Sequence, residues 1–166
     1  MKEILQEIEE IKKLKAKYCY YVDGYFEDET MLDKLVNEIF AEDSTVDFSP
    51  FGTAKGRSAI KDWFKNVCYK NLSFCMHMVH NPIIEIIQEN KALGTWYFEV
   101  PCTIQNPEIL NQIKRKTSTA SWLTGKYEEE YEKINGKWYI KSLKVKWTYW
   151  TPYDRGWEEE NIIPQK

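Results

Sequence analysis

Residues 131–140 read Tyr-Glu-Lys-Ile-Asn-Gly-Lys-Trp-Tyr-Ile. Runs rich in aromatic and β-branched residues flank Asn135-Gly136, and Asn-Gly favours a two-residue hairpin turn because both of its positions readily take a positive φ. The stretch therefore predicts an antiparallel hairpin. One strand is expected over Ser118–Ile134 and the next over Lys137–Tyr149.

Two further long strands are expected before this hairpin. Apolar and β-branched residues run over Leu72–Ile87 and over Lys91–Ile104, with the turn 88–90 between them. The segment 105–117 follows, with Pro107 and the basic triplet 114–116. We expect it to form an exposed loop or short helix over the mouth of the fold, where it can act as a lid. A solvated face is the favoured interpretation of the triplet, and steering of an anionic substrate is the alternative.

Helical periodicity fills the first part of the chain. Apolar residues recur at steps of three and four over Glu3–Val22, and Gly24 is expected as a left-handed C-terminal cap. A second amphipathic helix is expected after a cap at Asp28 or Thr30, and a third begins at Ser58. A short strand, 45–49, and the turn 50–52 lie between the last two helices.

This order of elements predicts an α+β fold in which a curved antiparallel sheet, a cone-shaped α+β barrel, wraps around about three helices. At 166 residues the chain is expected to form a single domain over 1–166. Residues 150–166, with the acidic run 158–160, are expected to be a C-terminal extension that is solvated or packs on a neighbour.

Composition narrows the function classes. The formal charge of −3 and the pI near 5.6 disfavour nucleic acid as a partner. No apolar run has the length of a membrane span, residues 1–10 are too charged for a secretory signal, and the four cysteines show no paired spacing. We therefore expect a cytoplasmic protein with reduced thiols and no membrane partner. The aromatic content of 15% predicts aromatic side chains in a cavity or a subunit interface.

The histidines are His77 and His80, both in the stretch 74–85. A strand sends the two side chains to opposite faces, so at most one faces a single-sided pocket, which argues against a metal site. A satisfied core histidine is the ordinary interpretation unless a partner lies elsewhere. Asp23 is a candidate partner because it stands in the last turn of the first helix, where the helix dipole disfavours a carboxylate. Surface exposure or a local turn hydrogen bond would also explain Asp23 there.

Several strings resemble the SnoaL-like branch of the nuclear-transport-factor-2-like (NTF2-like) superfamily over nearly the whole chain. These strings are residues 13–24, 40–48, 55–60, 76–84, 94–99 and 131–140. Within the branch they look most like the bile-acid 7α-dehydratases, and scytalone dehydratase and a dehydrochlorinase are more distant. The resemblance implies that His77 is the catalytic base, that Asp23 orients it, and that Tyr18 binds or protonates the leaving oxygen. It implies neither metal nor cofactor.

Two features depart from this pattern. Tyr18 and Asp23 are five positions apart, about 140° around an ideal helix, so Tyr18 rests on the resemblance alone. Val100 stands where the bile-acid dehydratases carry an aspartate, and an arginine near the end of their last strand has no clear match. Both differences make the expected pocket less charged.

Strand alternation gives candidates for the pocket walls. Trp96 and Phe98 share the face of Val100 and are expected to bind a flat or polycyclic ligand, although ordinary core packing is equally compatible. Trp147, near the end of the last strand, fits a pocket rim or a subunit interface.

The sequence therefore predicts a cofactor-independent lyase (dehydratase) or isomerase acting on a hydrophobic cyclic carbonyl compound, in a homo-oligomer that is a trimer or a dimer. One alternative is a non-catalytic protein of the same fold that binds a small molecule. Another is a scaffold subunit resembling the small subunits of ring-hydroxylating dioxygenases.

Overall fold

The computed structural model describes residues 2–159 as an α+β fold in which one seven-stranded sheet curls around helices. Its strands are β1 Phe40–Asp47, β2 Thr53–Lys55, β3 Leu72–Cys75, β4 Met78–Gln88, β5 Lys91–Ile104, β6 Thr119–Ile134 and β7 Lys137–Pro152. The helices are α1 Lys2–Gly24, α2 Met31–Lys34, α3 Arg57–Trp63, α4 Tyr69–Asn71, α5 Pro107–Gln112 and α6 Gly156–Glu159. Two π-helical segments continue α2 and α3 and are η1 Leu35–Ile39 and η2 Phe64–Cys68.

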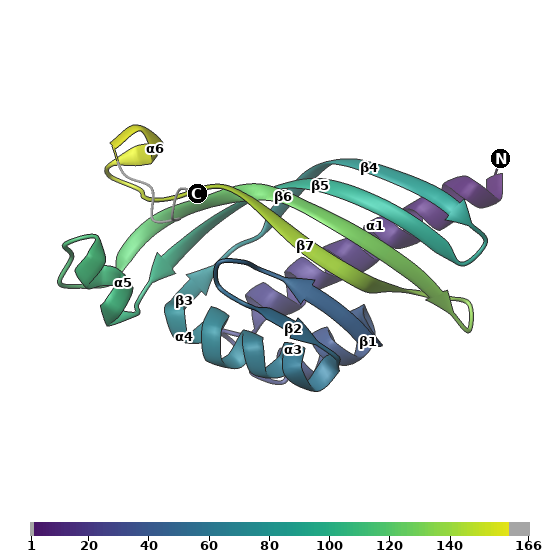
Figure 1. The fold of residues 1–166 in the computed structure, drawn as a ribbon, viewed down its shortest axis with the longest axis horizontal. Helices are drawn as coiled ribbons and strands as arrows, with labels where there is room; N and C mark the ends of the chain where they lie inside the picture. The colour runs from purple at the N-terminus through teal and green to yellow at the C-terminus, as the bar shows by residue number, and fades with distance from the viewer. Residues whose placement is uncertain (1, 160–166) are drawn as a thin grey trace.

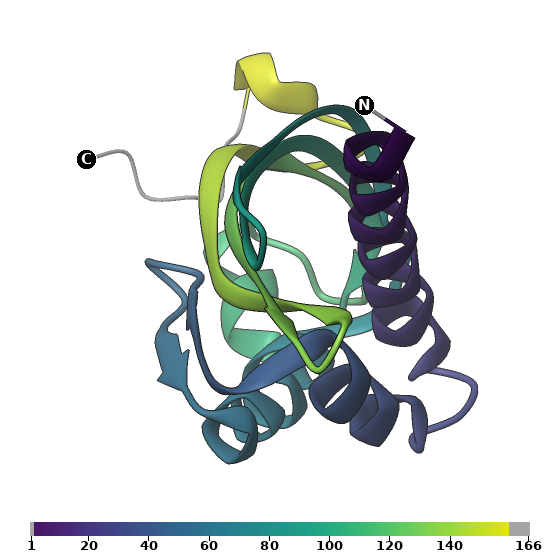
Figure 2. The same ribbon diagram turned by 90° about the vertical axis from the view of Figure 1, so that its right-hand side faces the viewer.

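The sheet has the order β2-β1-β7-β6-β5-β3, and β4 also pairs with β5. Its long strands arch over the helical layer (Figure 1). Viewed end-on, the sheet forms an arc, and α1 lies across its open side (Figure 2). The apolar faces of sheet and helices thus meet in one core, as the predicted cone requires.

The Asn135-Gly136 hairpin is confirmed. Ile134 pairs with Lys137, and both turn residues have a positive φ, 51° and 78°. The β5–β6 ladder runs without interruption from Lys91 opposite Glu132 to Ile104 opposite Thr119. These local antiparallel pairings form the rigid wall of the cone.

The sheet is mixed rather than wholly antiparallel. β1 pairs with β7 in parallel, for example Val46 with Leu143, and with β2 in antiparallel. The short strand expected over 45–49 begins earlier, at Phe40. Its partner β7 lies about a hundred residues away in the sequence, so local pattern could not reveal the direction of pairing.

The strand predicted over Leu72–Ile87 is divided into β3 and β4, which lie in line along the same edge of β5. The interruption falls at Met76 and His77. The Met76 N–H still donates to the Pro101 carbonyl at 3.1 Å. Pro101 has no N–H with which to complete the pair, so the ladder of backbone hydrogen bonds is broken there. Backbone groups at the interruption can therefore bond to other parts of the protein.

Two local expectations in the helical part are wrong, the left-handed cap at Gly24 and the start of the third helix. Gly24 does not have the positive φ of a left-handed cap, and its carbonyl instead accepts the N–H groups of Glu27 and Asp28. Of the two caps expected for the second helix, Asp28 accepts the Thr30 N–H through its carboxylate at 2.9 Å, and the Thr30 hydroxyl donates to the same carboxylate. The third helix begins at Arg57, one residue before Ser58.

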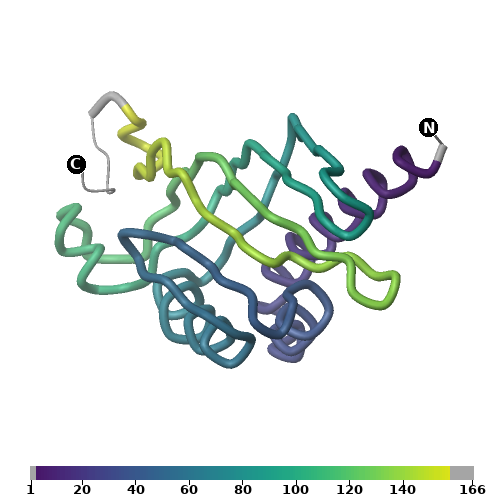
Figure 3. The backbone as a smooth tube through the Cα atoms, turned by 45° about the vertical axis from the view of Figure 1, so that its right-hand side comes forward, coloured from purple at the N-terminus to yellow at the C-terminus, as the bar shows by residue number. Residues whose placement is uncertain are grey.

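The segment 105–117 contains the short helix α5, capped by the Asn106 side chain, which accepts the Glu108 N–H at 2.8 Å. α5 and α6 lie at one end of the sheet, and the start of α1 lies at the other (Figure 3). Arg115 of the basic triplet bonds the Asp154 carboxylate. β7 continues to Pro152, so residues 150–152 belong to the sheet and not to an extension. The expected acidic run reaches Glu160, which lies outside the described residues.

Within residues 2–159, the helices lack a stretch with the length and hydropathy that a bilayer span requires.

Candidate active site

The end of α1 meets the interruption between β3 and β4, and this junction brings Asp23 to His77. The Asp23 Oδ1 lies 2.6 Å from the His77 Nδ1, and its Oδ2 accepts the His77 backbone N–H at 2.8 Å. Cys75, at the end of β3, donates its thiol to the same Oδ1 at 3.4 Å. The carboxylate therefore fixes both the backbone and the ring of His77.

This contact determines which ring nitrogen is available. With Nδ1 donating to the carboxylate, the neutral form of the imidazole carries its lone pair on Nε2, which can then accept a proton. The His77 side chain is 10% exposed and lines a cavity. The ring of Tyr18 stands edge-on to it, with centroids 6.0 Å apart. The His77 ring thus lies between Tyr18 and Asp23. This position explains how two residues five positions apart on α1 can both contact the same ring.

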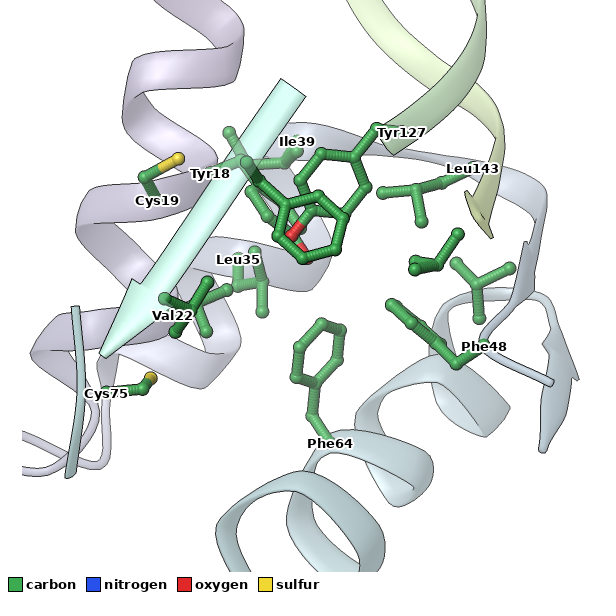
Figure 4. Close-up of a cluster of buried hydrophobic side chains, with 14 of the residues drawn as sticks. Tyr18, Cys19, Val22, Leu35, Ile39, Phe48, Phe64, Cys75, Tyr127 and Leu143 are labelled. Carbon is green, nitrogen blue, oxygen red and sulfur yellow. The ribbon is translucent and has the colours of Figure 1, made fainter. Parts of the chain in front are cut away.

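The cavity has a volume of about 70 Å³ and lies between the curled sheet and the α3–η2 helical stretch. Its lining is mainly aromatic and aliphatic, and the tyrosine pair Tyr18 and Tyr127 lies near Phe48 and Phe64 (Figure 4). The indole N–H groups of Trp63 and Trp147 are bonded to backbone carbonyls. The Trp150 indole donates to the Ser121 hydroxyl, and the Asn71 side chain accepts from Asn106. The other polar groups of the lining come from Tyr18, Cys68, His77 and Tyr127.

The lining of this cavity includes three of the four predicted wall residues. Phe98 and Val100 are buried in it, and Trp147 is half-buried. The expectation for Trp96 is wrong. Its side chain faces inward, as alternation predicts, but lies outside the cavity and donates its indole N–H to the Tyr131 hydroxyl at 2.9 Å. Alternation gives the face of a strand and not the position along it.

None of the cavity-lining residues belongs to the segment 105–117, but Asn106 of that segment donates to the side chain of the lining residue Asn71 at 2.6 Å, and a lid role stays a prediction. His80 lies on the outer face, with its side chain 42% exposed, 3.7 Å from the Glu99 carboxylate. Its ring is nearly parallel to that of Tyr97. The two histidines face opposite sides, as the strand pattern predicts.

A buried ion pair behind the cavity was missed by the sequence analysis. Lys15 is 0% exposed, and its Nζ lies 2.5 Å from the Oε1 of Glu129, which is 3% exposed. Lys15 lies on the same stripe of α1 as Ile11 and Tyr18, and Glu129 has the inward parity of Tyr127 and Tyr131 on β6. Periodicity could have found both residues. The usual preference of Lys and Glu for the surface hid them.

Burial governs the ionisation of the groups around the cavity. It raises the pKa of Tyr18 and of Tyr127 well above the ordinary phenol value, so both are neutral hydrogen-bond donors at neutral pH. It also raises the pKa of the Cys75 thiol, which therefore stays protonated beside Asp23. The ligand atoms of Asp23, Cys75 and His77 lie within 4.8 Å of one another, a spacing that can hold a metal ion. Their mutual hydrogen bonds account for this cluster without one.

Comparison with known proteins gives a family and several structural relatives. The model of the SnoaL-like domain family matches residues 3–144. A candidate scytalone dehydratase from Novosphingobium aromaticivorans is 22% identical with a TM-score of 0.73, and the match covers 92% of each chain. Hexachlorocyclohexane dehydrochlorinase LinA-type3 from Novosphingobium barchaimii is 20% identical with a TM-score of 0.73, and the match covers 89% of this chain and 90% of that one.

A candidate aromatic ring hydroxylase from Novosphingobium aromaticivorans also has a similar structure. It is 18% identical with a TM-score of 0.70, and the match covers 89% of this chain and 94% of that one. At these identities the structural likeness establishes a shared fold, and function must come from the site.

Proposed function

The chain belongs to the SnoaL-like domain family, and from that premise we propose that it is a cofactor-independent lyase or isomerase that removes a proton next to a carbonyl group. The observation that carries this proposal is the Asp23–His77 hydrogen bond at the wall of an apolar cavity. It supplies a general base whose free nitrogen has access to a small molecule.

In the proposed reaction the His77 Nε2 takes a proton from the carbon next to the carbonyl. The imidazolium that forms is stabilised by the Asp23 carboxylate on its other nitrogen, and such acid–base catalysis typically contributes about 10²–10⁴-fold. The carbonyl withdraws the electron pair as an enolate, which is why no cofactor is needed. In this proposal the hydroxyl of Tyr18, which lines the cavity beside Tyr127, donates a hydrogen bond to an oxygen of the same molecule.

Two outcomes balance from this enolate. In a dehydration, the enolate re-forms the carbonyl and expels a hydroxyl group from the β carbon, and that hydroxyl leaves as water with the proton of the imidazolium, which returns His77 to its starting form. In an isomerisation of a compound with a double bond between its β and γ carbons, the enolate is a dienolate, and the imidazolium returns the proton to the γ carbon while the double bond moves between the α and β carbons. Both need one base, one donor and a dry pocket.

The lining indicates the substrate class. The cavity lining contains no Asp, Glu, Lys or Arg side chain, so an uncharged, hydrophobic molecule fits it best. A cavity of about 70 Å³ is about half the volume of an engineered cavity that binds benzene. A single ring therefore enters only if half-buried rim side chains such as Phe51 and Trp147 shift, and a polycyclic ligand fits poorly.

A second candidate function is binding without catalysis. It is favoured by Val100, which is 1% exposed in the wall and offers no acid or base opposite His77. A scaffold role like that of the dioxygenase small subunits would require neither the cavity nor the Asp23–His77 bond. Assembly as a homo-trimer or homo-dimer remains a prediction, which sedimentation equilibrium can test.

Proton exchange tests the proposal without knowledge of the natural substrate. Small cyclic ketones are incubated with the protein in D₂O, and loss of the α-proton NMR signal is followed. We expect exchange with at least one ketone and a fall of at least about 10²-fold in His77→Gln. His80→Gln is the matched control and should leave the rate unchanged. Exchange that persists in His77→Gln would assign the chemistry elsewhere, and no exchange with any ketone would favour the binding function.

A further inference from the structure

The Lys15–Glu129 pair is costly for a protein to bury. Both side chains are completely removed from solvent, and replacing such a pair with apolar residues of similar size is often neutral or stabilising. Stability alone is therefore a weak reason for its presence. Its position behind the cavity suggests a different one.

The Lys15 ammonium is enclosed by aromatic faces and a single carboxylate. Its Nζ lies 4.2 Å from the ring centroid of Tyr18 and 3.5 Å from that of Tyr127. Glu129 accepts from the ammonium through Oε1 and from the Tyr131 hydroxyl through Oε2, and Tyr131 in turn accepts from the Trp96 indole. The charged groups lie outside the cavity lining, whereas Tyr18 and Tyr127 line it.

A cation on the face of a phenol changes what its hydroxyl can do. It draws π-electron density toward itself, so the O–H becomes a stronger donor to negative charge, and the low dielectric of a buried site strengthens this effect. The Glu129 carboxylate opposes it, but the ammonium lies against the rings and is in direct contact with both. The pair should therefore favour an anion hydrogen-bonded to Tyr18 or Tyr127.

We propose that Lys15, balanced by Glu129, is a positioning residue that acts through Tyr18 and Tyr127 to raise the affinity of the cavity for an anionic oxygen relative to a neutral one. The ligand class is a small ring bearing an enolate or phenolate oxygen. This inference rests on the proposed function, because an enolate is the charged species of that reaction, yet it concerns binding and can be tested without turnover.

Several other ionisable groups lie near the hydroxyls of Tyr18 and Tyr127 and act on their charge. Besides Glu129 and Tyr131, these groups include Cys19, Asp23 and Cys68. His77 contacts Tyr18 and could itself take the proton of a bound phenol. The test therefore uses proteins in which His77 is replaced by Gln, so that the proposed base contributes nothing to the measurement.

The probe is para-nitrophenol, a single ring whose phenolate absorbs in the visible and whose neutral phenol does not. Titration at several pH values gives the affinities of both forms for His77→Gln alone and with added substitutions. We expect Lys15→Met to lower the ratio of phenolate to phenol affinity by at least about tenfold, since it removes the cation and leaves Glu129 unpaired. Lys17→Met, an exposed lysine on the same helix, is the control and should leave the ratio unchanged.

The double substitution Lys15→Met with Glu129→Gln keeps the proposal testable if Lys15→Met alone does not fold. It removes both charges, so a purely structural pair predicts an unchanged affinity ratio in the folded protein. We expect the ratio to fall by about threefold or more. An unchanged ratio in the folded double variant, or no saturable binding of nitrophenol to His77→Gln, would overturn the proposal. Neither result would affect the proton-exchange test of His77.

Discussion

The Asp23 carboxylate binds His77 twice, through its ring Nδ1 at 2.6 Å and through its backbone N–H at 2.8 Å. The backbone bond is possible because His77 sits where the ladder between β3 and β4 is interrupted. The N–H of Met76 points to β5, so that of the next residue points to the open edge. The end of α1 occupies that edge. A single carboxylate thus links the helix to the sheet and sets the tautomer of the candidate base.

The first prediction concerns that tautomer. In Asp23→Asn the amide can donate to Nδ1, so the proton should move to Nε2 and the candidate base should be lost. We expect ¹⁵N NMR to show an unprotonated Nε2 in the wild type and a protonated Nε2 in the variant. The proton-exchange rate should fall by about 10²-fold or more. Asp28→Asn, at a half-buried position in the turn before α2, serves as the control, and an unchanged His77 tautomer in Asp23→Asn would contradict the assigned role.

The second prediction concerns the four thiols. Burial raises the pKa of Cys19 and Cys68 to about 12 and that of Cys102 to about 11, and it raises the pKa of Cys75 as well. The thiolate is the reactive form, so a raised pKa means little thiolate at neutral pH. Labelling by a disulfide reagent should be slow in the folded protein, rise as the pH approaches 11, and be fast for all four thiols in denaturant. Rapid labelling of any cysteine in the native protein at pH 7 would contradict this burial.

Much of the fold could be predicted because its signals are local. The Asn135-Gly136 turn fixes a hairpin by its own dihedral preferences, and the alternation along β5 places Phe98 and Val100 inward. The parallel pairing of β1 with β7 could not be predicted, since nothing within residues 40–47 identifies a partner strand so distant in the sequence. The division into β3 and β4 depends on Pro101, a residue of the neighbouring strand.

The candidate site could be predicted from the sequence less completely than the fold. Residue type and resemblance point to His77, Asp23 and Tyr18, and in the structure Asp23 and Tyr18 both contact the His77 ring, while Tyr18 and His77 line the cavity. Their catalytic roles remain proposals. Lys15 was overlooked because lysine is rarely buried, although its place in the helical repeat matches that of its apolar neighbours. Strand alternation predicts that Trp96 faces inward, but it does not give the position of the side chain along the length of the cone. The cavity could therefore not be distinguished from the core beside it.

The third prediction concerns the acid side of the stability curve. Hydrogen bonds from Lys133 and Trp138 hold the pKa of Glu7 below its usual range. A carboxylate with a lowered pKa in the folded state stabilises above its unfolded pKa, and this stabilisation is lost as the pH falls through the folded value. Glu7→Gln should therefore cost about 1 kcal/mol in urea unfolding at pH 7. The difference should shrink as the pH falls through the lowered folded-state pKa of Glu7 and vanish below it.

Glu27→Gln is the control for Glu7, because Glu27 is exposed in the loop after α1. It should change the unfolding free energy little at either pH. A Glu7→Gln penalty that persists undiminished at acid pH would show that packing, not charge, is what the substitution removes.

The fourth prediction concerns Gly125, which lies at a register shift of β6 against β7. A Cβ there would lie 2.3 Å from the Lys146 carbonyl oxygen and 2.9 Å from the Phe98 ring. The carbonyl belongs to the backbone of β7 and cannot rotate away, so Gly125→Ala should destabilise the protein by more than about 2 kcal/mol. Because Phe98 also lines the cavity, the same change should weaken nitrophenol binding.

Gly136→Ala is the matched control for Gly125→Ala. A Cβ at Gly136 would meet nothing within 4 Å, so only the positive φ opposes the substitution. The expected cost is about 1–2 kcal/mol. Urea unfolding of the two variants measures the difference, and equal penalties would mean that β7 yields at Lys146 and that the bulge does not require glycine.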